Sequence, residues 1–324
     1  MSVKQIAALV ADDLDRVEEA IAAHLESDVS FISEVGRYVL SSGGKRIRPV
    51  LLILCARLGN YASERVYDLC TVIEFIHTAT LLHDDVIDKA HLRRGNPTVN
   101  SRWGNDISIL IGDYLYAKAM EMALTDKDHL VMATVARVTK EMAKGQVLET
   151  LKERDLSITE NEYNRIIGLK TAALFEGSCT IGALAAGLTP PQRALVSAFG
   201  RHLGLAFQMA DDTLDFVAPE TTLGKPVNND LKEGKITLPV ILAVAQATAA
   251  QVAAIDAYLQ DPDATGADFQ AVIDILNEYG ALQATMAKAQ AHVEMAKAQL
   301  AALPASTALE TLLALADYVT SRDV

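Results

Sequence analysis

The segment TVIEFIHTATLLHDDVID, residues 71–88, joins a long apolar run to a cluster of acidic residues. Its apolar residues recur with the periodicity of a helix. Asp84 and Asp88 stand four positions apart, with Asp85 beside the first, so a helix projects two carboxylates from one face about one turn apart. The segment therefore predicts an α-helix whose last turn carries convergent negative charge.

A second segment, MADDTLDF at residues 209–216, repeats this arrangement with Asp211, Asp212 and Asp215. Like charges at this spacing repel each other, and partial burial increases the penalty. Mg²⁺ relieves the repulsion because it takes a few carboxylate oxygens and completes its shell with water and substrate phosphates. One such cluster is equally well explained as a solvated helix end, whereas two matching clusters favour a metal site. An EF-hand is excluded because its glycine and its terminal glutamate spacing are missing.

Each acidic cluster is accompanied by a polar side chain on the same helix face. His77 precedes Asp84 by seven residues and Asp88 by eleven, and Gln208 precedes Asp211 by three. A single buried His or Gln is more often a satisfied core residue. Because both are aligned with the acidic clusters, we interpret them as candidate site residues.

Helical periodicity covers most of the chain. It recurs in residues 6–21, 62–90, 106–124, 128–149, 160–187, 191–216, 238–259, 268–280 and 281–302. Alternating runs of Val and Ile bounded by turn residues are absent, so we expect no sheet. No segment has the composition of an interdomain linker. The sequence thus predicts an all-α protein with one domain over residues 1–324, in which residues 1–30 form an N-terminal helical arm.

The composition restricts the class of protein. Asp and Glu total 42 and Lys and Arg total 29, which gives a net charge of -13 and makes nucleic acid a poor candidate as partner. The N-terminal segment lacks the apolar stretch of a signal peptide, and the three cysteines lack the spacing of metal ligands or of a disulfide framework. We therefore expect a soluble, cytoplasmic protein.

Basic residues grouped beside glycine are local exceptions to the acidic charge. They are Lys45, Arg46 and Arg48 in GGKRIRP (residues 43–49), Arg93 and Arg94 after the first acidic cluster, Lys170 beside Thr171, and Lys225 and Lys235 in a long loop at residues 218–239. Guanidinium groups bind phosphate through paired hydrogen bonds, and Lys supplies a point charge. Lys225 or Lys235 alone is explained as well by an ordinary surface cation. Together, acids suited to Mg²⁺ and cations suited to phosphate predict a diphosphate substrate.

In its ordered set of motifs the chain resembles the trans-isoprenyl diphosphate synthase family, most strongly the bacterial octaprenyl diphosphate synthases. The set is GGKRIRP (43–49), LLHDDVIDKAHLRRG (81–95), GDYLYAKA (112–119), KT (170–171), FQMADDTLDF (207–216), GKP (224–226) and Lys235. The resemblance covers nearly the whole chain. It implies a single large helical bundle of the isoprenoid synthase type with a central active-site cavity, assembled as a homodimer.

The resemblance also implies a role for each candidate residue. Lys45, Arg48, His77 and Arg94 would hold the diphosphate of isopentenyl diphosphate. Asp84, Asp88 and Asp211 would carry three Mg²⁺ ions, with Asp85, Asp212 and Asp215 in or just behind that shell. Arg93, Lys170, Lys225 and Lys235 would neutralise the allylic diphosphate, while Thr171 and Gln208 would orient and stabilise the reacting centre. The proton released on condensation would pass to the departing diphosphate, so no side chain is assigned as a general base.

Product length depends on a weaker inference. Ala79 and Thr80 occupy positions, one turn before the first acidic cluster, that gate the hydrophobic tunnel in this family. Both are small, so a growing chain can pass them, which excludes a farnesyl-type product better than it sets the final length. Met120 and Met122 are candidate floor residues of which only one would face the tunnel, and core packing explains either one more simply. Eight isoprene units on a farnesyl diphosphate primer, for a quinone side chain, rest on the resemblance, and nine or ten stay open.

Two alternatives explain the motifs less well. A terpene cyclase or head-to-head synthase shares the helical fold, but the complete second acidic cluster and GGKRIRP favour isopentenyl diphosphate as second substrate. A non-catalytic partner subunit is disfavoured because both acidic clusters are intact. Release of a polyprenyl product predicts transient membrane contact, although no anchor is visible.

Overall fold

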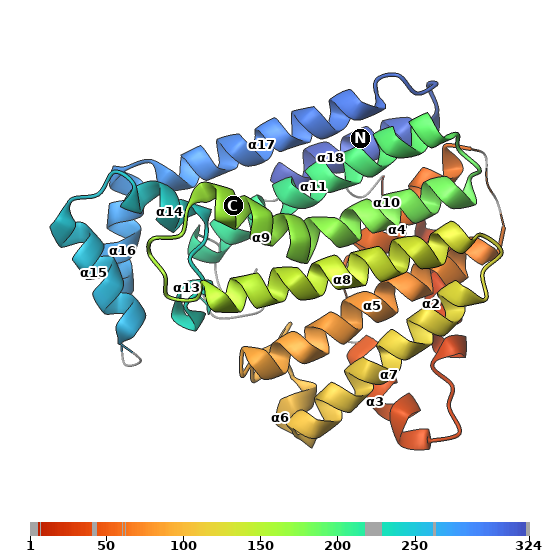
Figure 1. The fold of residues 1–324 in the computed structure, drawn as a ribbon, viewed down its shortest axis with the longest axis horizontal. Helices are drawn as coiled ribbons and strands as arrows, with labels where there is room; N and C mark the ends of the chain where they lie inside the picture. The colour runs from red at the N-terminus through yellow and green to blue at the C-terminus, as the bar shows by residue number, and fades with distance from the viewer. Residues whose placement is uncertain are drawn as a thin grey trace. The chain divides into compact units, whose positions relative to one another are not determined.

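The computed structural model describes residues 6, 8–40, 44–59, 61, 63–217, 229–261 and 264–321. Nearly all regular structure in these ranges is helical (Figure 1), which confirms the predicted all-α class. Within the same ranges, no helix combines the length and apolar character that crossing a membrane requires.

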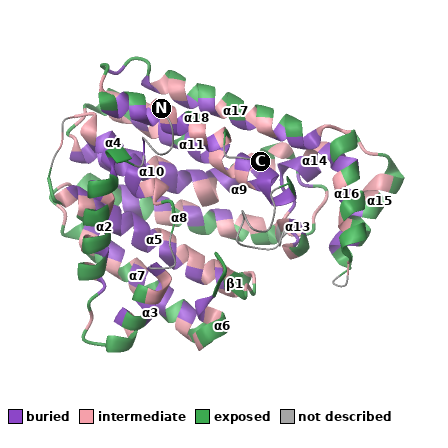
Figure 2. Cartoon of the chain, turned by 180° about the vertical axis from the view of Figure 1, so that it is seen from behind, coloured by how far each residue is buried: buried purple, intermediate pink, exposed green. Residues whose placement is uncertain are grey.

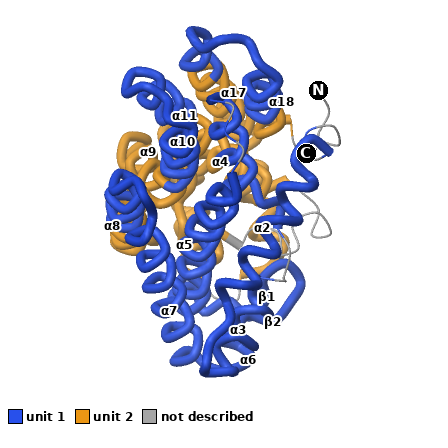
Figure 3. The backbone as a smooth tube through the Cα atoms, turned by 90° about the vertical axis from the view of Figure 1, so that its right-hand side faces the viewer, with its two compact units in different colours: residues 1–140, 174–200, 297–316 blue, residues 141–173, 201–296, 317–324 orange. Residues whose placement is uncertain are grey.

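The chain divides into two compact units (Figure 3). Unit 1 comprises residues 1–140, 174–200 and 297–316, and unit 2 comprises residues 141–173, 201–296 and 317–324. The expectation of one domain over residues 1–324 stays a prediction.

Unit 1 contains most of the helices of the N-terminal half. They are α2 (Ala11–His24), α3 (Ser30–Leu40), α4 (Ile47–Arg57), α5 (Arg65–Ile87), α6 (Val99–Trp103), α7 (Asn105–Leu124) and nearly all of α10 (Ala173–Ala185). An antiparallel hairpin of β1 (Leu92–Arg93) and β2 (Asn96–Pro97) links α5 to α6. The expectation of no sheet is therefore wrong for two residues in each strand.

Unit 2 contains shorter helices and one π-helix. They are α9 (Glu160–Ile167), the π-helix η1 (Gly168–Ala172), α13 (Asn229–Glu233), α14 (Leu238–Val244), α15 (Ala249–Gln260) and α16 (Gly266–Glu278). Four further helices have residues in both units, namely α8 (His129–Leu151), α11 (Pro190–Val217), α17 (Ala281–Leu300) and α18 (Thr307–Thr320).

The core of unit 1 is built around α5, which packs against α2, α4 and α7. Figure 2 shows the buried residues of these helices in purple. All eight residues from 49 to 56 of α4 are buried, so this helix lacks an exposed face. A Cβ atom on Gly182 of α10 would lie 2.3 Å from the carbonyl oxygen of Leu52, and glycine thus permits the backbones of α10 and α4 to approach closely.

The core of unit 2 holds the C-terminal end of α11 in place. Met209 and Phe216 of α11 belong to an apolar cluster with Leu238 of α14 and Val272 of α16. The ring of Phe216 stacks on Phe269 with a centroid distance of 6.3 Å. The second acidic cluster is thereby carried on a helix end that is buried on its apolar side.

Arg46 connects three segments of unit 1 before α4 begins. Its backbone has a φ of 45°, which is uncommon for a residue other than glycine. Its guanidinium donates to Glu18 of α2 at 2.7 Å and to Glu74 of α5 at 2.6 Å, and also to the carbonyl oxygen of Leu40 at 2.8 Å. Glu74 is only 3% exposed, so Arg46 compensates a buried charge and serves the fold.

Glu74→Gln is expected to lower the free energy of unfolding by about 2 kcal/mol, because the buried guanidinium of Arg46 loses its buried ionic partner. Chemical denaturation followed by circular dichroism measures the change. Glu18→Gln is the matched control, since the more exposed partner should cost less than about 1 kcal/mol. Equal losses in the two variants would contradict the assignment of Glu74 as the structural partner.

Candidate active site

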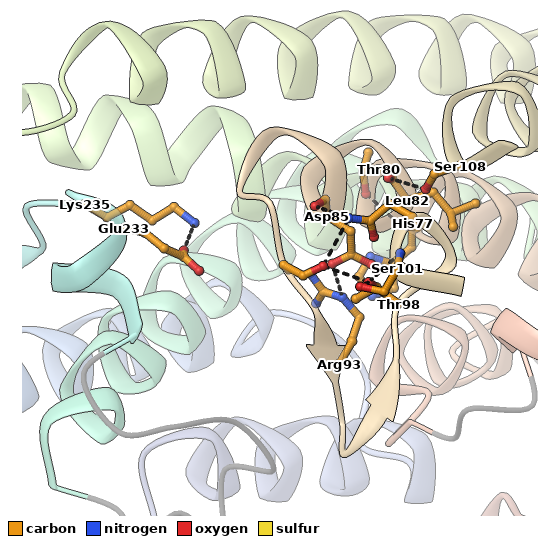
Figure 4. Close-up of polar contacts among 12 residues, drawn as sticks. His77, Thr80, Leu82, Asp85, Arg93, Thr98, Ser101, Ser108, Glu233 and Lys235 are labelled. Atoms are coloured by element: carbon orange, nitrogen blue, oxygen red, sulfur yellow. Dashed lines mark hydrogen bonds and ion pairs between the residues drawn. The ribbon is translucent and has the colours of Figure 1, made fainter. Parts of the chain in front are cut away.

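The first acidic cluster lies at the end of α5. The backbone N–H of Asp88 donates to the carbonyl oxygen of Asp84 at 2.8 Å, so the last helical turn extends through both residues. Asp84 and Asp88 are partly buried, whereas Asp85 is 3% exposed. The carboxylate of Asp85 accepts from Arg93 Nε at 2.8 Å and lies 2.7 Å from Arg93 Nη2 (Figure 4). Burial raises the pKa of Asp85, and the Arg93 hydrogen bond and charge oppose that rise.

The hairpin after α5 places two arginines beside this cluster. Arg93 pairs with Asn96, so the turn consists of Arg94 and Gly95, with φ values of 52° and 78°. Two positive φ values in a two-residue loop are typical of a type I′ turn, where asparagine is usually preferred at the position that Arg94 fills. Such a backbone costs about 1–2 kcal/mol for an L-residue that is not glycine. Backbone strain at a defined position, such as that of Arg94, often marks a functional site.

Side chains of the next segment fasten the hairpin to α5. Thr98 Oγ1 donates to the carbonyl oxygen of Ala90 at 2.7 Å, and Asn100 Nδ2 donates to that of Asp85 at 3.2 Å. Asp85 is therefore held through its carboxylate by Arg93 and through its backbone by Asn100. The position of Arg94 relative to the end of α5 follows from these contacts.

A cationic group surrounds His77 in the middle of α5. Arg48 Nη1 lies 3.1 Å from His77 Nε2, and the Arg48 guanidinium carbon lies 4.9 Å from the centre of the Phe175 ring. An arginine can only donate, so His77 Nε2 is the acceptor and its imidazole is neutral. Burial and the charges of Arg48, Arg94, Arg93 and Arg46 hold the pKa of His77 well below its usual range. The same positive potential makes this part of unit 1 attractive to an anion.

The cations of GGKRIRP have different surroundings. Lys45 is exposed, Arg48 contacts His77, and Arg46 is used by Glu18 and Glu74. A Cβ atom on Gly44 would lie 2.8 Å from Arg94 Nη1, so a glycine here leaves room for that guanidinium. Gly43 lies outside the described residues.

The three acids of the second acidic cluster, at the end of α11, differ in how deeply they are buried. Asp211 is partly buried, whereas Asp212 and Asp215 are 2% and 1% exposed. Asp215 Oδ2 accepts from the backbone N–H of Asp230 at 3.1 Å, where α13 begins. Asp212 accepts from Tyr163 Oη at 2.5 Å and from Gln208 Nε2 at 2.7 Å. Protein donors therefore contact both buried carboxylates, and the metal role predicted for Asp212 and Asp215 stays a prediction.

The π-helix carries Lys170 and Thr171, and π-helices occur frequently at functional sites. A Cβ atom on Gly145 of α8 would lie 2.5 Å from the backbone nitrogen of Lys170, so the two backbones approach closely. Lys170 forms an ion pair with Glu149, and Thr171 Oγ1 donates to Gln208 Oε1 at 2.7 Å. Thr171 and Gln208, predicted as a pair of site residues, are thus in direct contact.

These groups line a pocket of about 110 Å³ within unit 2. Five residues of its polar lining were not predicted from the sequence, namely Glu149, Lys152, Tyr163, Asp230 and Thr237. No motif of the sequence marked them, and some of their partners are distant along the chain. Tyr163 and Asp212, for example, are separated by 49 positions.

Two predicted lysines of the long loop have different outcomes. Lys235 lines the pocket, and its Nζ lies 2.7 Å from Glu233 Oε2 (Figure 4). Lys225 and GKP (residues 224–226) lie outside the described residues, as do residues 218–228 of the loop.

The predicted gate residues lie one turn before Asp84. Ala79 is fully buried, and Thr80 is partly buried. The hydroxyl of Thr80 donates a hydrogen bond to the carbonyl oxygen of His77 at 2.6 Å (Figure 4). On α7, the buried side chains near the C-terminal end are those of Ala119 and Ala123. Met120 is 36% exposed and Met122 is partly buried, so neither methionine belongs to the fully buried face of α7. Their role as a tunnel floor stays a prediction.

The donor set of the acidic clusters suits a hard divalent cation. Within the described ranges, no three His, Cys, Asp or Glu side chains are grouped so that they could hold a metal ion by themselves. Mg²⁺ commonly uses one or two carboxylates and takes its other ligands from water and substrate phosphates. The partly buried pair Asp84 and Asp88, on one face of α5, fits that requirement.

Comparisons with known proteins point to one family. A family model described as polyprenyl synthetase matches residues 29–276. The octaprenyl diphosphate synthase of Escherichia coli (strain K12) is 38% identical over 323 residues, and component 2 of the heptaprenyl diphosphate synthase of Geobacillus stearothermophilus is 36% identical over 324, each covering 100% of both chains. A polyprenyl synthase from Caulobacter crescentus CB15, solved in complex with calcium and isoprenyl diphosphate, matches with a TM-score of 0.94 at 37% identity, covering 99% of this chain and 98% of that one.

Arg94→Asn is expected to weaken the binding of inorganic pyrophosphate about 10-fold, because it removes one cation from the group around His77. Asparagine tolerates the positive φ at this position, so the free energy of unfolding should stay the same or rise slightly. Isothermal titration calorimetry measures the affinity, and Arg37→Asn, which removes an exposed cation from α3, is the control. Equal affinity in all three proteins would show that Arg94 does not contribute to an anion site.

Proposed function

Because this chain belongs to the polyprenyl synthetase family and is a prenyltransferase, we propose that it extends farnesyl diphosphate with isopentenyl diphosphate to octaprenyl diphosphate, for a quinone side chain. One observation carries the proposal. Asp85, inside the first acidic cluster, is bonded to Arg93 of the cationic group, so carboxylates suited to Mg²⁺ and cations suited to phosphate adjoin at the end of α5.

The group around His77 is proposed to bind the diphosphate of isopentenyl diphosphate. Arg48, Arg94 and Lys45 supply positive charge, and neutral His77 supplies a polar side chain among them. Arg46 is left out of this set because its charge is compensated by Glu18 and Glu74. Guanidinium groups favour phosphate oxygens because they donate two hydrogen bonds at once.

The acids of the two clusters are proposed to hold Mg²⁺, with three ions per site by family resemblance. Asp84, Asp88 and Asp211 are the proposed ligands, and their greater exposure relative to Asp85, Asp212 and Asp215 supports this division. When bound, the metal supplies positive charge that stabilises the departing allylic diphosphate.

Further cations are proposed to neutralise the same allylic diphosphate. Arg93, Lys170 and Lys235 each have a carboxylate partner in this structure, respectively Asp85, Glu149 and Glu233. These ion pairs keep three long side chains ordered at defined places. Lys225 is proposed as a fourth such cation by resemblance alone.

Thr171 and Gln208 are proposed to stabilise the allylic cation that forms when diphosphate leaves. Both line the pocket of unit 2, and both present oxygen atoms whose partial negative charge favours a nearby positive carbon. The proton lost after condensation goes to the released diphosphate, so no side chain acts as a general base.

A homodimer and a transient membrane contact complete the proposal. Leu110 and Leu124 of α7 are 61% and 72% exposed. Large apolar side chains at such exposure are consistent with an interface that a second copy covers. The product carries a long hydrocarbon chain, which must transfer to lipid.

The test is incubation of the purified protein with farnesyl diphosphate, labelled isopentenyl diphosphate and Mg²⁺, followed by mass measurement of the products. A main product of eight isoprene units is expected. Removal of Mg²⁺ with a chelator should abolish incorporation. A main product of seven, nine or ten units would refute the octaprenyl assignment. Absence of incorporation by the folded protein would instead favour a subunit that requires a partner, as the name of the Geobacillus relative implies for that protein.

Thr80→Phe is expected to shorten the product by several isoprene units, because an aromatic ring one turn before Asp84 would block a growing chain. Thr80 is preferred over the fully buried Ala79, where added volume would strain the core. Thr80→Val keeps the size of the side chain and should leave the length unchanged. Product lengths measured by mass spectrometry decide, and unaltered length in the Phe variant would exclude Thr80 as a gate.

A further inference from the structure

Four side chains of unit 2 that line the pocket form a continuous line of hydrogen bonds, from the buried Tyr163 to the more exposed Thr171. Tyr163 Oη donates to Asp212 Oδ2 at 2.5 Å, and Gln208 Nε2 donates to Asp212 Oδ1 at 2.7 Å. Thr171 Oγ1 then donates to Gln208 Oε1 at 2.7 Å. Tyr163 and Asp212 are 3% and 2% exposed, so the inner half of the line is shielded from water.

The orientation of the Gln208 amide depends on this line. Its two ends are almost the same size, so hydrogen-bond partners alone decide which end faces which way. The Thr171 hydroxyl cannot decide, because it can donate as well as accept. In its ionised form the Asp212 carboxylate can only accept, and it therefore draws Nε2 toward itself and leaves Oε1 directed to Thr171.

Tyr163 in turn holds the carboxylate of Asp212. Burial, with the charges of Asp230 and Asp211, raises the pKa of Asp212 well above its usual range, and the hydrogen bonds from Tyr163 and Gln208 offset only part of that rise. A buried carboxylate without sufficient donors is costly, and a rigid donor on each oxygen also restricts its rotation. Tyr163 supplies the donor on the side away from Gln208.

We infer that Tyr163 and Asp212 are positioning residues that fix the Gln208 amide with its oxygen toward Thr171, and that Asp212 does this instead of ligating Mg²⁺. The inference rests on the proposed function, in which the oxygens of Thr171 and Gln208 stabilise the allylic cation. Both carboxylate oxygens of Asp212 already accept from protein donors, whereas Asp211 beside it is more exposed. The reversed amide would place an NH₂ group where the positive carbon forms.

Tyr163→Phe tests the inference in the incorporation assay. We expect kcat to fall about 10-fold, as for other residues that orient a site from behind, with KM unchanged for both substrates. Tyr258→Phe is the matched control, because Tyr258 is also buried in unit 2 and its hydroxyl has no hydrogen-bond partner among the described residues. Its kcat should equal that of the wild type.

A double-mutant cycle separates positioning from a general structural effect. If Tyr163 acts through Gln208, then Tyr163→Phe should cause no further loss in a Gln208→Leu background. Losses that multiply in the double variant would overturn the inference, as would a kcat of Tyr163→Phe within twofold of wild type. Wild-type protein without incorporation would refute the proposed function, and this inference with it.

The Mg²⁺ dependence of Asp212→Asn provides a second test that does not require the Tyr163 variant to fold. We expect a lower kcat with the Mg²⁺ concentration for half-maximal rate unchanged. Asp211→Asn, by contrast, should raise that concentration severalfold. A comparable rise in Asp212→Asn would identify Asp212 as a metal ligand and overturn the inference.

Discussion

The ion pair of Asp85 with Arg93 is the contact on which the candidate site of unit 1 depends. A carboxylate this deeply buried requires a strong donor, and the guanidinium of Arg93 provides one from the first strand of the hairpin. Fastening the hairpin to α5 in this way also determines where Arg94 lies, and Arg94 completes the positive potential around His77. The ion pair between Asp85 and Arg93 is therefore structural, and it determines where Arg94 lies. Arg94 in turn adds to the positive potential that an anion would encounter.

Both acidic clusters follow one physical rule, although they lie in different units. In each, the acid next to the first is buried and hydrogen-bonded, Asp85 to Arg93 and Asp212 to Tyr163 and Gln208. The first acid of each cluster, Asp84 or Asp211, stays partly accessible. Adjacent acids on a helix point about 100° apart, so one can enter the core while its neighbour faces outward. Two aspartates in a row therefore combine a buried, hydrogen-bonded side chain with a more exposed one.

Sequence patterns predicted those features whose signal is local. The regular burial of Val131, Val135 and Val138 gives α8 a clear period, and α5, α7 and α11 were located within a few residues. α4 was not predicted, because eight consecutive buried residues leave no alternation of faces. The expected helix at 238–259 is divided at residues 245–248, where Thr248 caps α15. The hairpin was not predicted, because Arg94 occupies a turn position at which asparagine is the usual sequence signal of a hairpin.

The candidate site shows the same division between local and distant signals. Paired acids and grouped cations were visible in the sequence because each group occupies a few consecutive positions. The partners of these residues were not visible in the sequence. Glu149 contacts Lys170, and Tyr163 contacts Asp212, only in the folded chain. Burial also could not be inferred, so the spacing of the acids alone gave no reason to expect Asp212 and Asp215 to be more buried than Asp211.

The π-helix at Gly168–Ala172 has a consequence for the phase of the long helical segment that contains it. A wider turn holds one residue more than an α-helical turn, and each added residue rotates everything beyond it by about 100° around the axis. The side chains of Lys170 and Thr171 are therefore out of step with the positions that a regular continuation of α9 would give them. Deletion of one residue in this turn could leave the segment helical without interruption. Every side chain on one side of the deletion would nevertheless point in a different direction around the helix axis. What the wide turn determines is the angular offset between two stretches of helix, a property that no single residue in it carries.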